Sequence, residues 1–294
     1  MLVHMFPAEL SLVSVFNTKQ LRERGVAPSD LRRAISDGKV IRLKRGWYTN
    51  VVGEHAADQH RLRVLAELRD HPGTVASHHS GAALLRLPVH RPDWTRVHLM
   101  RTGPGLAQNR AGVVIHQRVG DAASCDPALV VAQTALFCPV SGLMALDHAL
   151  RNKTVRLRDF DHWAKALEAH AGRAHLRVVR RLCDDLHESP LESRTTYVLD
   201  CWGWTMQPQF EVPGTPHRVD GRLKGTRVLV ECDGKGKYDE PGASVREKVR
   251  EDDLRALNWQ VVRVTTELLD ERSTLALRVR NAVEMDRRFS ALAG

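Results

Sequence analysis

In the first 50 residues, short apolar segments alternate with residues that favour helix caps and turns. The positions of these cap and turn residues constrain the fold more than any other feature. Asn17 can cap a first helix over residues 19–24, and Gly25 can end it. A second helix, over residues 29–37, ends at Gly38, because glycine tolerates the positive φ of a helix end. The spacing therefore predicts two short helices joined by a tight turn.

Two short strands are expected next, over residues 40–43 and 47–49, on either side of a basic turn that Gly46 allows. Two helices followed by a basic hairpin is the order of a winged helix-turn-helix. In that fold the second helix enters the major groove and the hairpin touches the DNA backbone. We expect DNA contacts from five cations of this segment: Arg32, Arg33, Arg42, Lys44 and Arg45.

The charge distribution supports a polyanionic partner. The chain carries a formal net charge of +9. Residues 1–52 hold nine Lys or Arg against four acids, so this segment alone contributes +5. An alternative interpretation is that the arginines form a solvated helix face and that the hairpin packs against the next domain.

The sequence of this segment resembles the abortive-infection type IV antitoxin family, over the stretch TKQLRERGVAPSDLRRAISDGKVIRLKRGWYTN. The stretch ASHHSGAALLRLPV resembles the same family and extends the likeness to about residue 150. The resemblance implies a winged helix that binds DNA, and a toxin protein as a further partner. Residues 53–184 otherwise mix helical and strand-like patterns, which predicts an α+β segment without a recognisable chemical motif.

Histidine is abundant in this chain, with 15 residues, and the adjacent pair His78-His79 is the obvious candidate for metal binding. Adjacent residues on a regular element point apart, and no HExxH spacing accompanies the pair. The sequence therefore favours a capping or packing role for both.

The C-terminal third places acidic residues at the ends of structural elements. Ser189 and Glu192 are spaced as a capping box around Pro190, which predicts a helix that runs to about residue 201. Residues 226–232 are rich in β-branched side chains and predict a strand that carries Glu231 near its end. Asp220 is expected on the neighbouring strand.

Four segments in this order, ESPLESRTTYVL, RVDGRL, RVLVECDGKGKY and EKVREDDLRALNWQVVRVTTELL, resemble the short-patch-repair-like branch of the PD-(D/E)xK endonuclease superfamily. The resemblance implies a mixed sheet flanked by helices and a divalent-metal site that cleaves phosphodiesters. Two carboxylates on adjacent strands suit Mg²⁺ or Mn²⁺, which prefer oxygen ligands. Asp220 and Glu231 are the expected ligands, and Glu192 is expected to bind the ion through water.

The chain departs from this superfamily at one position, because Asp233 stands where the pattern has its lysine. Lys235 or Lys237 could supply the missing cation, and Lys237 occupies the place of the histidine usual in this branch. A protein that kept the fold and lost catalysis would show the same departure. In the next predicted helix, residues 245–257, Lys248 and Arg250 are candidates for phosphate contacts.

These patterns predict a multidomain α/β protein with three parts: a winged helix-turn-helix (1–52), an α+β middle segment (53–184) and a restriction-endonuclease-like domain (185–294). The five cysteines form no CxxC pair, and neither a signal peptide nor a membrane span is recognisable, so a cytoplasmic location is expected. The predicted function is metal-dependent DNA cleavage, or alternatively non-enzymatic autorepression by an antitoxin, and a homodimer fits either. An RNA target is a third possibility.

Overall fold

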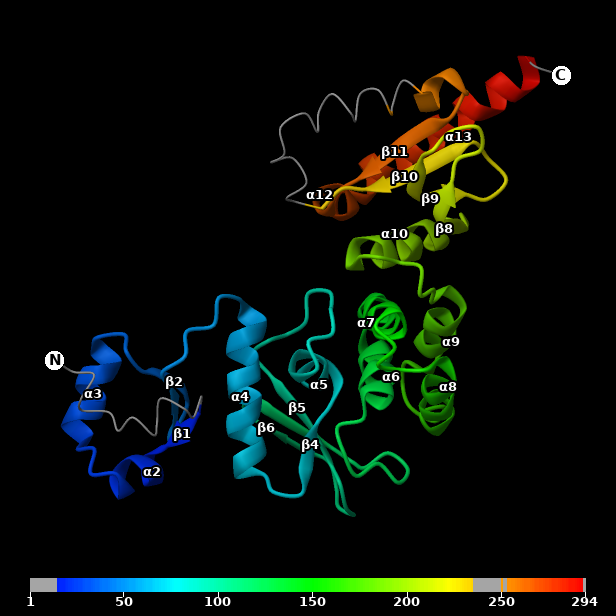
Figure 1. Cartoon of the computed structure of the whole chain (residues 1–294). Helices are drawn as coiled ribbons and strands as arrows, with labels where there is room; N and C mark the ends of the chain where they lie inside the picture. Colours follow the sequence, from blue (N-terminus) through cyan, green and yellow to red (C-terminus); the bar gives the residue numbers. More distant parts are fainter. Residues whose placement is uncertain (1–14, 235–249, 251–252, 293–294) are drawn as a thin grey trace. The chain divides into compact units, whose positions relative to one another are not determined.

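The computed structural model describes residues 15–234, 250 and 253–292, and its contacts divide the chain into two compact units (Figure 1). The first unit comprises Met1–Cys138 with Arg158–Arg173, and the second comprises Pro139–Leu157 with Ala174–Gly294. The chain thus passes between the units three times. The predicted boundaries at 52/53 and 184/185 stay predictions. Among the described residues, no helix combines the length and the apolar character that crossing a membrane requires.

The N-terminal module has the predicted order of two helices and a hairpin, with each helix starting and ending within one residue of expectation. The side chain of Asn17 accepts from the backbone of Gln20, whose own side chain accepts from the backbone of Asn17, so the first helix begins with a reciprocal capping box. Gly46 adopts the positive φ, +82°, that the hairpin turn needs. A strand that the sequence did not predict, β1, pairs with β3 and extends the hairpin to an antiparallel sheet of order β1-β3-β2. The elements are β1 (Phe16–Asn17), α2 (Thr18–Glu23), α3 (Pro28–Ser36), β2 (Ile41–Lys44) and β3 (Trp47–Thr49).

The hairpin of this module packs against the long helix that follows it, α4 (Ala56–Asp70). Trp47 of β3 shares a buried apolar cluster with Leu62 and Ala66 of α4, and its indole Nε1 donates to Asp70 Oδ1 at 2.8 Å. The side of the hairpin that carries Trp47 therefore packs on the next segment of the chain, as the alternative interpretation of the sequence expected. The module also has a small core of its own, made of Phe16, Leu21, Val26, Ala34 and Val40.

The rest of the first unit is built on a four-stranded sheet of order β4-β5-β7-β6, in which β5 and β7 run parallel and the other pairs are antiparallel. A fully buried histidine, His60 of α4, joins this helix to its neighbours. Its Nδ1 lies 3.0 Å from the Trp94 carbonyl, and its Nε2 lies 2.8 Å from the Oγ of Ser80, which belongs to the helix α5. The elements are β4 (Thr74–Ala76), α5 (His78–Leu84), β5 (Val97–Arg101), β6 (Gln108–Arg110), β7 (Val113–His116), α6 (Pro127–Phe137) and α8 (Leu157–Ala166).

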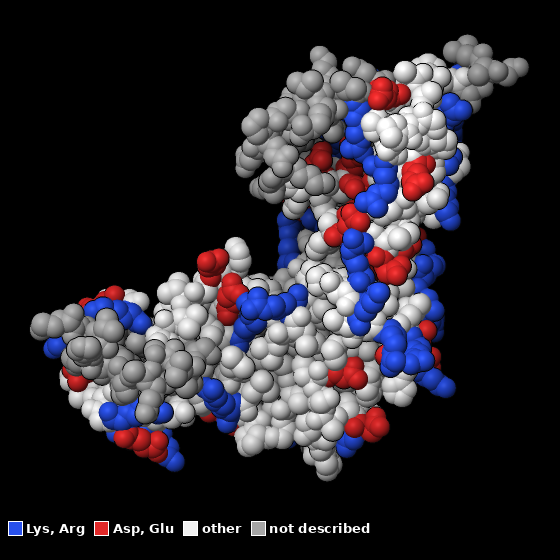
Figure 2. All heavy atoms as spheres, viewed as in Figure 1, with Lys and Arg blue, Asp and Glu red and all other residues white. Residues whose placement is uncertain are grey.

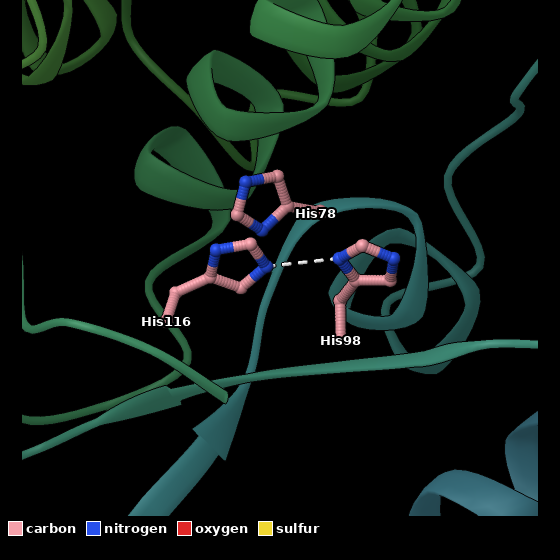
Figure 3. Close-up of side chains that lie close together, drawn as sticks. All are labelled: His78, His98 and His116. Carbon is pink, nitrogen blue, oxygen red and sulfur yellow. Dashed lines mark hydrogen bonds between the residues drawn. The ribbon is translucent and has the colours of Figure 1, made fainter. Parts of the chain in front are cut away.

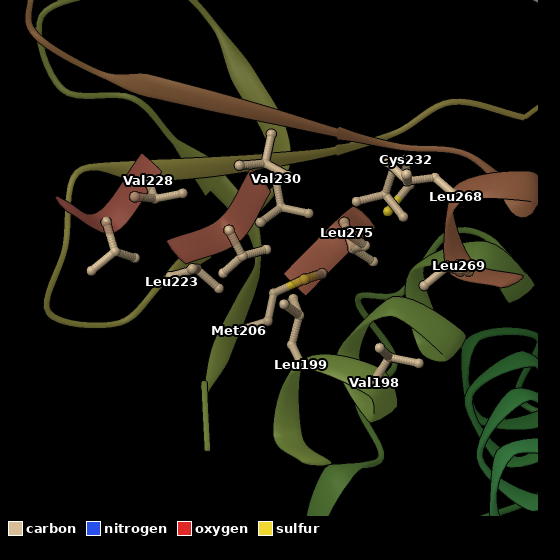
Figure 4. Close-up of a cluster of buried hydrophobic side chains, with 14 residues drawn as sticks. Val198, Leu199, Met206, Leu223, Val228, Val230, Cys232, Leu268, Leu269 and Leu275 are labelled. Atoms are coloured by element: carbon tan, nitrogen blue, oxygen red, sulfur yellow. The ribbon is translucent and has the colours of Figure 1, made fainter. Parts of the chain in front are cut away.

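The second unit contains a mixed four-stranded sheet of order β11-β10-β9-β8, in which β10 and β11 are parallel and the other pairs antiparallel. One face of the sheet packs on α10, α12 and α13 through a buried cluster that includes Leu199, Val230 and Val279 (Figure 4). The sheet is thus mixed and flanked by helices, as expected. The elements are α7 (Pro139–Arg151), α9 (Arg173–Leu182), α10 (Pro190–Cys201), β8 (Met206–Glu211), β9 (Arg218–Leu223), β10 (Val228–Cys232), β11 (Gln260–Val264), α12 (Thr266–Asp270) and α13 (Arg272–Leu292).

A buried ion pair joins α7 to the segment before α10 in this unit. His187 Nδ1 lies 2.8 Å from Asp147 Oδ2, and each side chain is 1 % exposed. His187 Nε2 lies 2.8 Å from Thr196 Oγ1. Burial acts to lower the pKa of His187, but the hydrogen bond and the negative charge of Asp147 outweigh burial and hold that pKa above its usual value.

The start of α10 corrects one detail of the sequence prediction. Ser189 Oγ accepts from the backbone N–H of Glu192 at 3.2 Å, so Ser189 is the cap. The carboxylate of Glu192 does not return to Ser189, however. It accepts instead from the backbone of Glu188 and from the side chain of Gln209, each at 2.9 Å, because Gln209 of β8 offers a second donor. Only half of the expected capping box is therefore present.

Candidate nucleic-acid interface

The second helix, α3, presents a pair of arginines to solvent. Ala34 is buried in the core of the module, and Leu31 and Ile35 pack against the same core. This apolar face fixes the rotation of the helix and leaves Arg32 and Arg33 exposed. Neither guanidinium forms a hydrogen bond or ion pair with another described residue, and the same is true of Arg45 at the hairpin turn. These three cations are available to an external anion.

Lys44 of the hairpin has a different role from these arginines. Its Nζ lies 2.6 Å from Glu67 Oε2 and 2.8 Å from Asp70 Oδ2, both on α4. Burial acts to lower the pKa of Lys44, but the hydrogen bonds and charges of the two acids outweigh it and raise the pKa. Lys44 therefore fastens the hairpin to α4, while the nearby Arg42 stays exposed and donates through Nε to the Lys44 carbonyl at 3.4 Å.

The three predicted metal-binding acids lie in the second unit on the expected elements. Asp220 is on β9 and Glu231 is on β10, and these strands pair directly, while Glu192 is buried near the start of α10. Each carboxylate is held by a donor from the protein. Asp220 Oδ2 accepts from the Cys232 backbone N–H at 2.7 Å, and Glu231 Oε1 lies 2.5 Å from Arg250 Nη2.

Two further predicted residues, Asp233 and Arg250, are described by the structure. Asp233 lies 3.9 Å from Arg263 Nη1, and Arg250 donates to the Arg218 carbonyl at 3.0 Å besides pairing with Glu231. On the face drawn in Figure 2, basic and acidic side chains are interspersed over the second unit. The predicted residues Lys235, Lys237 and Lys248 lie outside the described residues.

The donor set around these acids does not fit a ready site for Mg²⁺. A carboxylate that ligates the ion needs a free lone pair directed at a common point. In the described part of the chain, the ligand atoms of Glu192, Asp220 and Glu231 do not form a group within 4.8 Å of one another. Backbone, amide and guanidinium groups contact one oxygen of each acid instead, and because the three acids do not converge, no catalytic step through a metal follows from this arrangement.

Among the described residues, a group of ligand-type side chains that does converge lies in the first unit, and the sequence did not predict it. His78, His98 and His116 place one ring nitrogen each within 4.8 Å of the others. The available signal was the position of two of these histidines inside apolar strands, Val97-His98-Leu99 and Val114-Ile115-His116. His79, which the sequence paired with His78, bonds to the Arg96 carbonyl instead.

The helix pair, the packed hairpin and the exposed arginines give the N-terminal module the order of elements of a helix-turn-helix. Residues 7–51 match the family model described as the transcriptional regulator AbiEi antitoxin, so the N-terminal part of the resemblance is confirmed. The match ends before His78, and the likeness of the middle segment stays a prediction. No curated protein matches the chain.

Proposed function

We propose that this protein is a DNA-binding regulator of the antitoxin type, which reads duplex DNA with α3 and touches the DNA backbone with the hairpin turn. One observation carries the proposal. The match to a regulator family covers the segment in which Arg32 and Arg33 stand exposed, without a protein partner among the described residues, on the second helix of a helix-turn-helix.

The basic residues of this module have different roles, which follow from whether each one is already paired with an acid of the protein. Arg32 and Arg33 contact bases or phosphates in the major groove, and Arg45 contacts phosphate. Lys44 contributes little to DNA affinity, because binding DNA would require it to leave Glu67 and Asp70. Its contribution is to hold the hairpin at a fixed angle against α4.

The test is DNA binding by the full chain, with a duplex first selected from a random pool and affinity then measured by fluorescence anisotropy. Arg32→Ala/Arg33→Ala is expected to weaken binding about 10- to 100-fold and to reduce the slope of log K against log salt by about 2. The matched control is Arg287→Ala/Arg288→Ala, which removes the same charge from an exposed pair on α13. Equal losses in both variants would reduce the effect to net charge and contradict a recognition role for α3.

The same proposal includes a protein partner and self-association. A regulator of the antitoxin type would bind a toxin protein, and a homodimer on DNA would read two half-sites about one helical turn apart. Analytical ultracentrifugation of the protein with the selected duplex gives the stoichiometry. One protein chain on the full selected duplex would exclude the dimer.

The second candidate is metal-dependent DNA cleavage by the second unit. It is supported by the pairing of β9, which carries Asp220, with β10, which carries Glu231. Two observations argue against it: the Arg250 guanidinium already lies beside Glu231, and the ligand atoms of Glu192, Asp220 and Glu231, all in the described part of the chain, do not form a group within 4.8 Å of one another. We therefore rank it below regulation.

Cleavage is tested with supercoiled, linear and single-stranded DNA in Mg²⁺, Mn²⁺ and EDTA. Nicking that disappears with EDTA and in the Asp220→Ala/Glu231→Ala variant would establish the nuclease and reverse this ranking. Full DNA binding without cleavage on any substrate would support the regulator. Matched RNA duplexes in the binding assay decide between DNA and RNA as the target.

A further inference from the structure

Three imidazoles converge in the first unit, away from the exposed arginines of α3: His78 and His98 are buried and His116 is half-buried. His78 begins α5, His98 lies on β5 and His116 ends β7. The three rings lie together in Figure 3, and the dashed line marks the 2.9 Å separation between His98 Nδ1 and His116 Nε2. His78 stacks on His116 with ring centroids 4.1 Å apart. The ligand-type nitrogens all lie within 4.8 Å of one another.

The fold brings these residues together from distant parts of the sequence. β5 and β7 are parallel neighbours, with His98 opposite Val114 and Met100 opposite His116. His98 and His116 are therefore two register positions apart on the same face of the sheet, since side chains two apart along a strand share a face. His78 approaches them from the start of α5.

The backbone of His78 is held in an unusual conformation. Its φ is +51°, in the left-handed region that residues other than glycine rarely adopt. The backbone N–H donates to Gln133 Oε1 at 3.4 Å, and its ring Nδ1 lies 3.1 Å from Ser77 Oγ. Backbone strain of this kind persists where the surrounding structure fixes the residue, and such residues are frequent at ligand sites. At His78 the strained backbone directs the imidazole toward the rings of His98 and His116.

The spacing suits a tetrahedral ion with one position left for a small ligand. Zn–N bonds of about 2.0–2.1 Å place tetrahedral ligand nitrogens about 3.4 Å apart, so small ring rotations would open the 2.9 Å contact to this distance. A cavity of about 200 Å³ adjoins the site and is lined by His78, His116, Gln133 and His170, among others. The cavity has room for water or a small anion on the open side of the ion.

We propose that His78, His98 and His116 bind a divalent first-row transition-metal ion, with Zn²⁺ the best match, and that its fourth position faces the cavity. This site does not depend on the DNA-binding role of α3. Three neutral nitrogen donors with an open position suit Zn²⁺, Co²⁺ or Ni²⁺ and disfavour Mg²⁺, which prefers oxygen. The competing account is a metal-free cluster held by the hydrogen bond between His98 and His116.

The test titrates the chelator-stripped full chain with Co²⁺ and follows the visible d–d absorption, which is intense only in near-tetrahedral coordination. We expect one equivalent of Co²⁺ to bind and one equivalent of Zn²⁺ to displace it. His116→Gln is expected to weaken Zn²⁺ binding at least about 100-fold. The matched control, His148→Gln, changes an exposed histidine in the other unit and should leave the affinity unchanged.

A second measurement on the wild type covers the case in which His116→Gln does not fold. X-ray absorption of the Zn²⁺-loaded chain should show three imidazole nitrogens at about 2.0 Å and one further ligand, the oxygen of water or a small anion. Fewer than three imidazoles would overturn the proposal, as would the absence of intense Co²⁺ absorption. Equal loss of binding in His148→Gln would mark the ion as adventitious only.

Discussion

Two buried histidines, one in each unit, form nearly the same pair of hydrogen bonds and yet have opposite pKa shifts. His60 lies between the Trp94 carbonyl and the Ser80 hydroxyl, and His187 lies between the Asp147 carboxylate and the Thr196 hydroxyl. Burial dominates at His60 and lowers its pKa to about 4. At His187 the carboxylate overcomes burial and raises the pKa.

The neighbours of each ring agree with this assignment of protons. The Trp94 carbonyl only accepts, so His60 carries its proton on Nδ1, and its Nε2 accepts from Ser80. Thr196 Oγ1 also lies 3.8 Å from Met206 Sδ, to which its hydroxyl can donate, so Thr196 Oγ1 can accept from His187 Nε2. An imidazolium at His187 would then donate through both nitrogens. Replacing a neutral carbonyl by a carboxylate thus reverses the direction of the pKa shift.

The largest expected effect comes from making the two sites alike. Asp147→Asn removes the anion and keeps the shape, so the protonated form of His187 loses its counter-charge and the ring is expected to become neutral, as His60 is. We expect a loss of about 3–5 kcal/mol in the free energy of unfolding at pH 6, and a His187 pKa below its usual value. Urea unfolding and NMR titration measure the two quantities. Asp121→Asn, at an exposed acid, is the control, and a loss under about 1 kcal/mol at Asp147 would refute the charged pair.

The second prediction concerns pH, for which the two histidines should act in opposite directions. The folded pKa of His60 is depressed, so its stabilising contribution is present above the unfolded pKa of about 6.5 and is lost as pH falls toward 4. The loss is about 1.4 kcal/mol per pH unit and about 3 kcal/mol in all. The folded pKa of His187 is raised, so its contribution is present below about 6.5 and is lost as pH rises through the folded value.

The check is urea unfolding of the wild type, His60→Gln and His187→Gln across this pH range. The stability difference between wild type and His60→Gln should shrink on acidification, and the difference for His187→Gln should shrink on alkalinisation. Slopes of the same sign for both variants would show that the carboxylate does not control the protonation of His187.

A smaller effect is expected when the hydroxyl beside His60 is removed. Ser80 Oγ donates to His60 Nε2 and accepts from the His98 backbone N–H at 2.9 Å, so Ser80→Ala leaves two buried polar groups unsatisfied. The expected loss of unfolding free energy is about 2 kcal/mol. Ser36→Ala, at an exposed serine, should change it by less than about 0.5 kcal/mol. Similar losses in the two variants would show that the hydrogen bonds of Ser80 to His60 and to the His98 backbone do not contribute to stability.

The smallest expected effect is that of Thr196→Val, which keeps the shape and removes the acceptor of the second His187 proton. A loss of about 1 kcal/mol is expected, concentrated at the pH values where His187 is protonated. The pH dependence of the urea midpoint measures it. A loss that is independent of pH would indicate that Thr196 donates to a neutral ring, contrary to the assignment above.

Local signals in the sequence were sufficient for the N-terminal module and for the strands of the second unit. Asn17, Gly38 and Gly46 behave as the sequence predicts: Asn17 caps a helix, and the two glycines adopt positive φ at a helix end and in a turn. The placement of Asp220 and Glu231 on paired strands was also correct. These features depend on a few consecutive residues, so they can be inferred without knowing the tertiary fold.

Features that depend on distant residues were not predictable in the same way. The acids that bind Lys44 come from α4, more than 20 residues later in the chain. No residue near Lys44 in the sequence indicates that these acids will contact it. The three histidines converge only once β5 and β7 pair and α5 folds back on them. The 21-residue helix α13 was missed because it lies beyond the last motif considered.

The three passages of the chain between the two units have a consequence for synthesis on the ribosome. α7 packs against α10, and Asp147 of α7 needs His187 as its partner. When Arg151 has been added, neither partner has yet been made, and translation to α10 takes roughly 2 to 8 s at about 5–20 residues per second. Until α10 has been made, α7 has no α10 to pack on and Asp147 has no histidine partner, so this part of the second unit cannot complete its core before translation reaches α10.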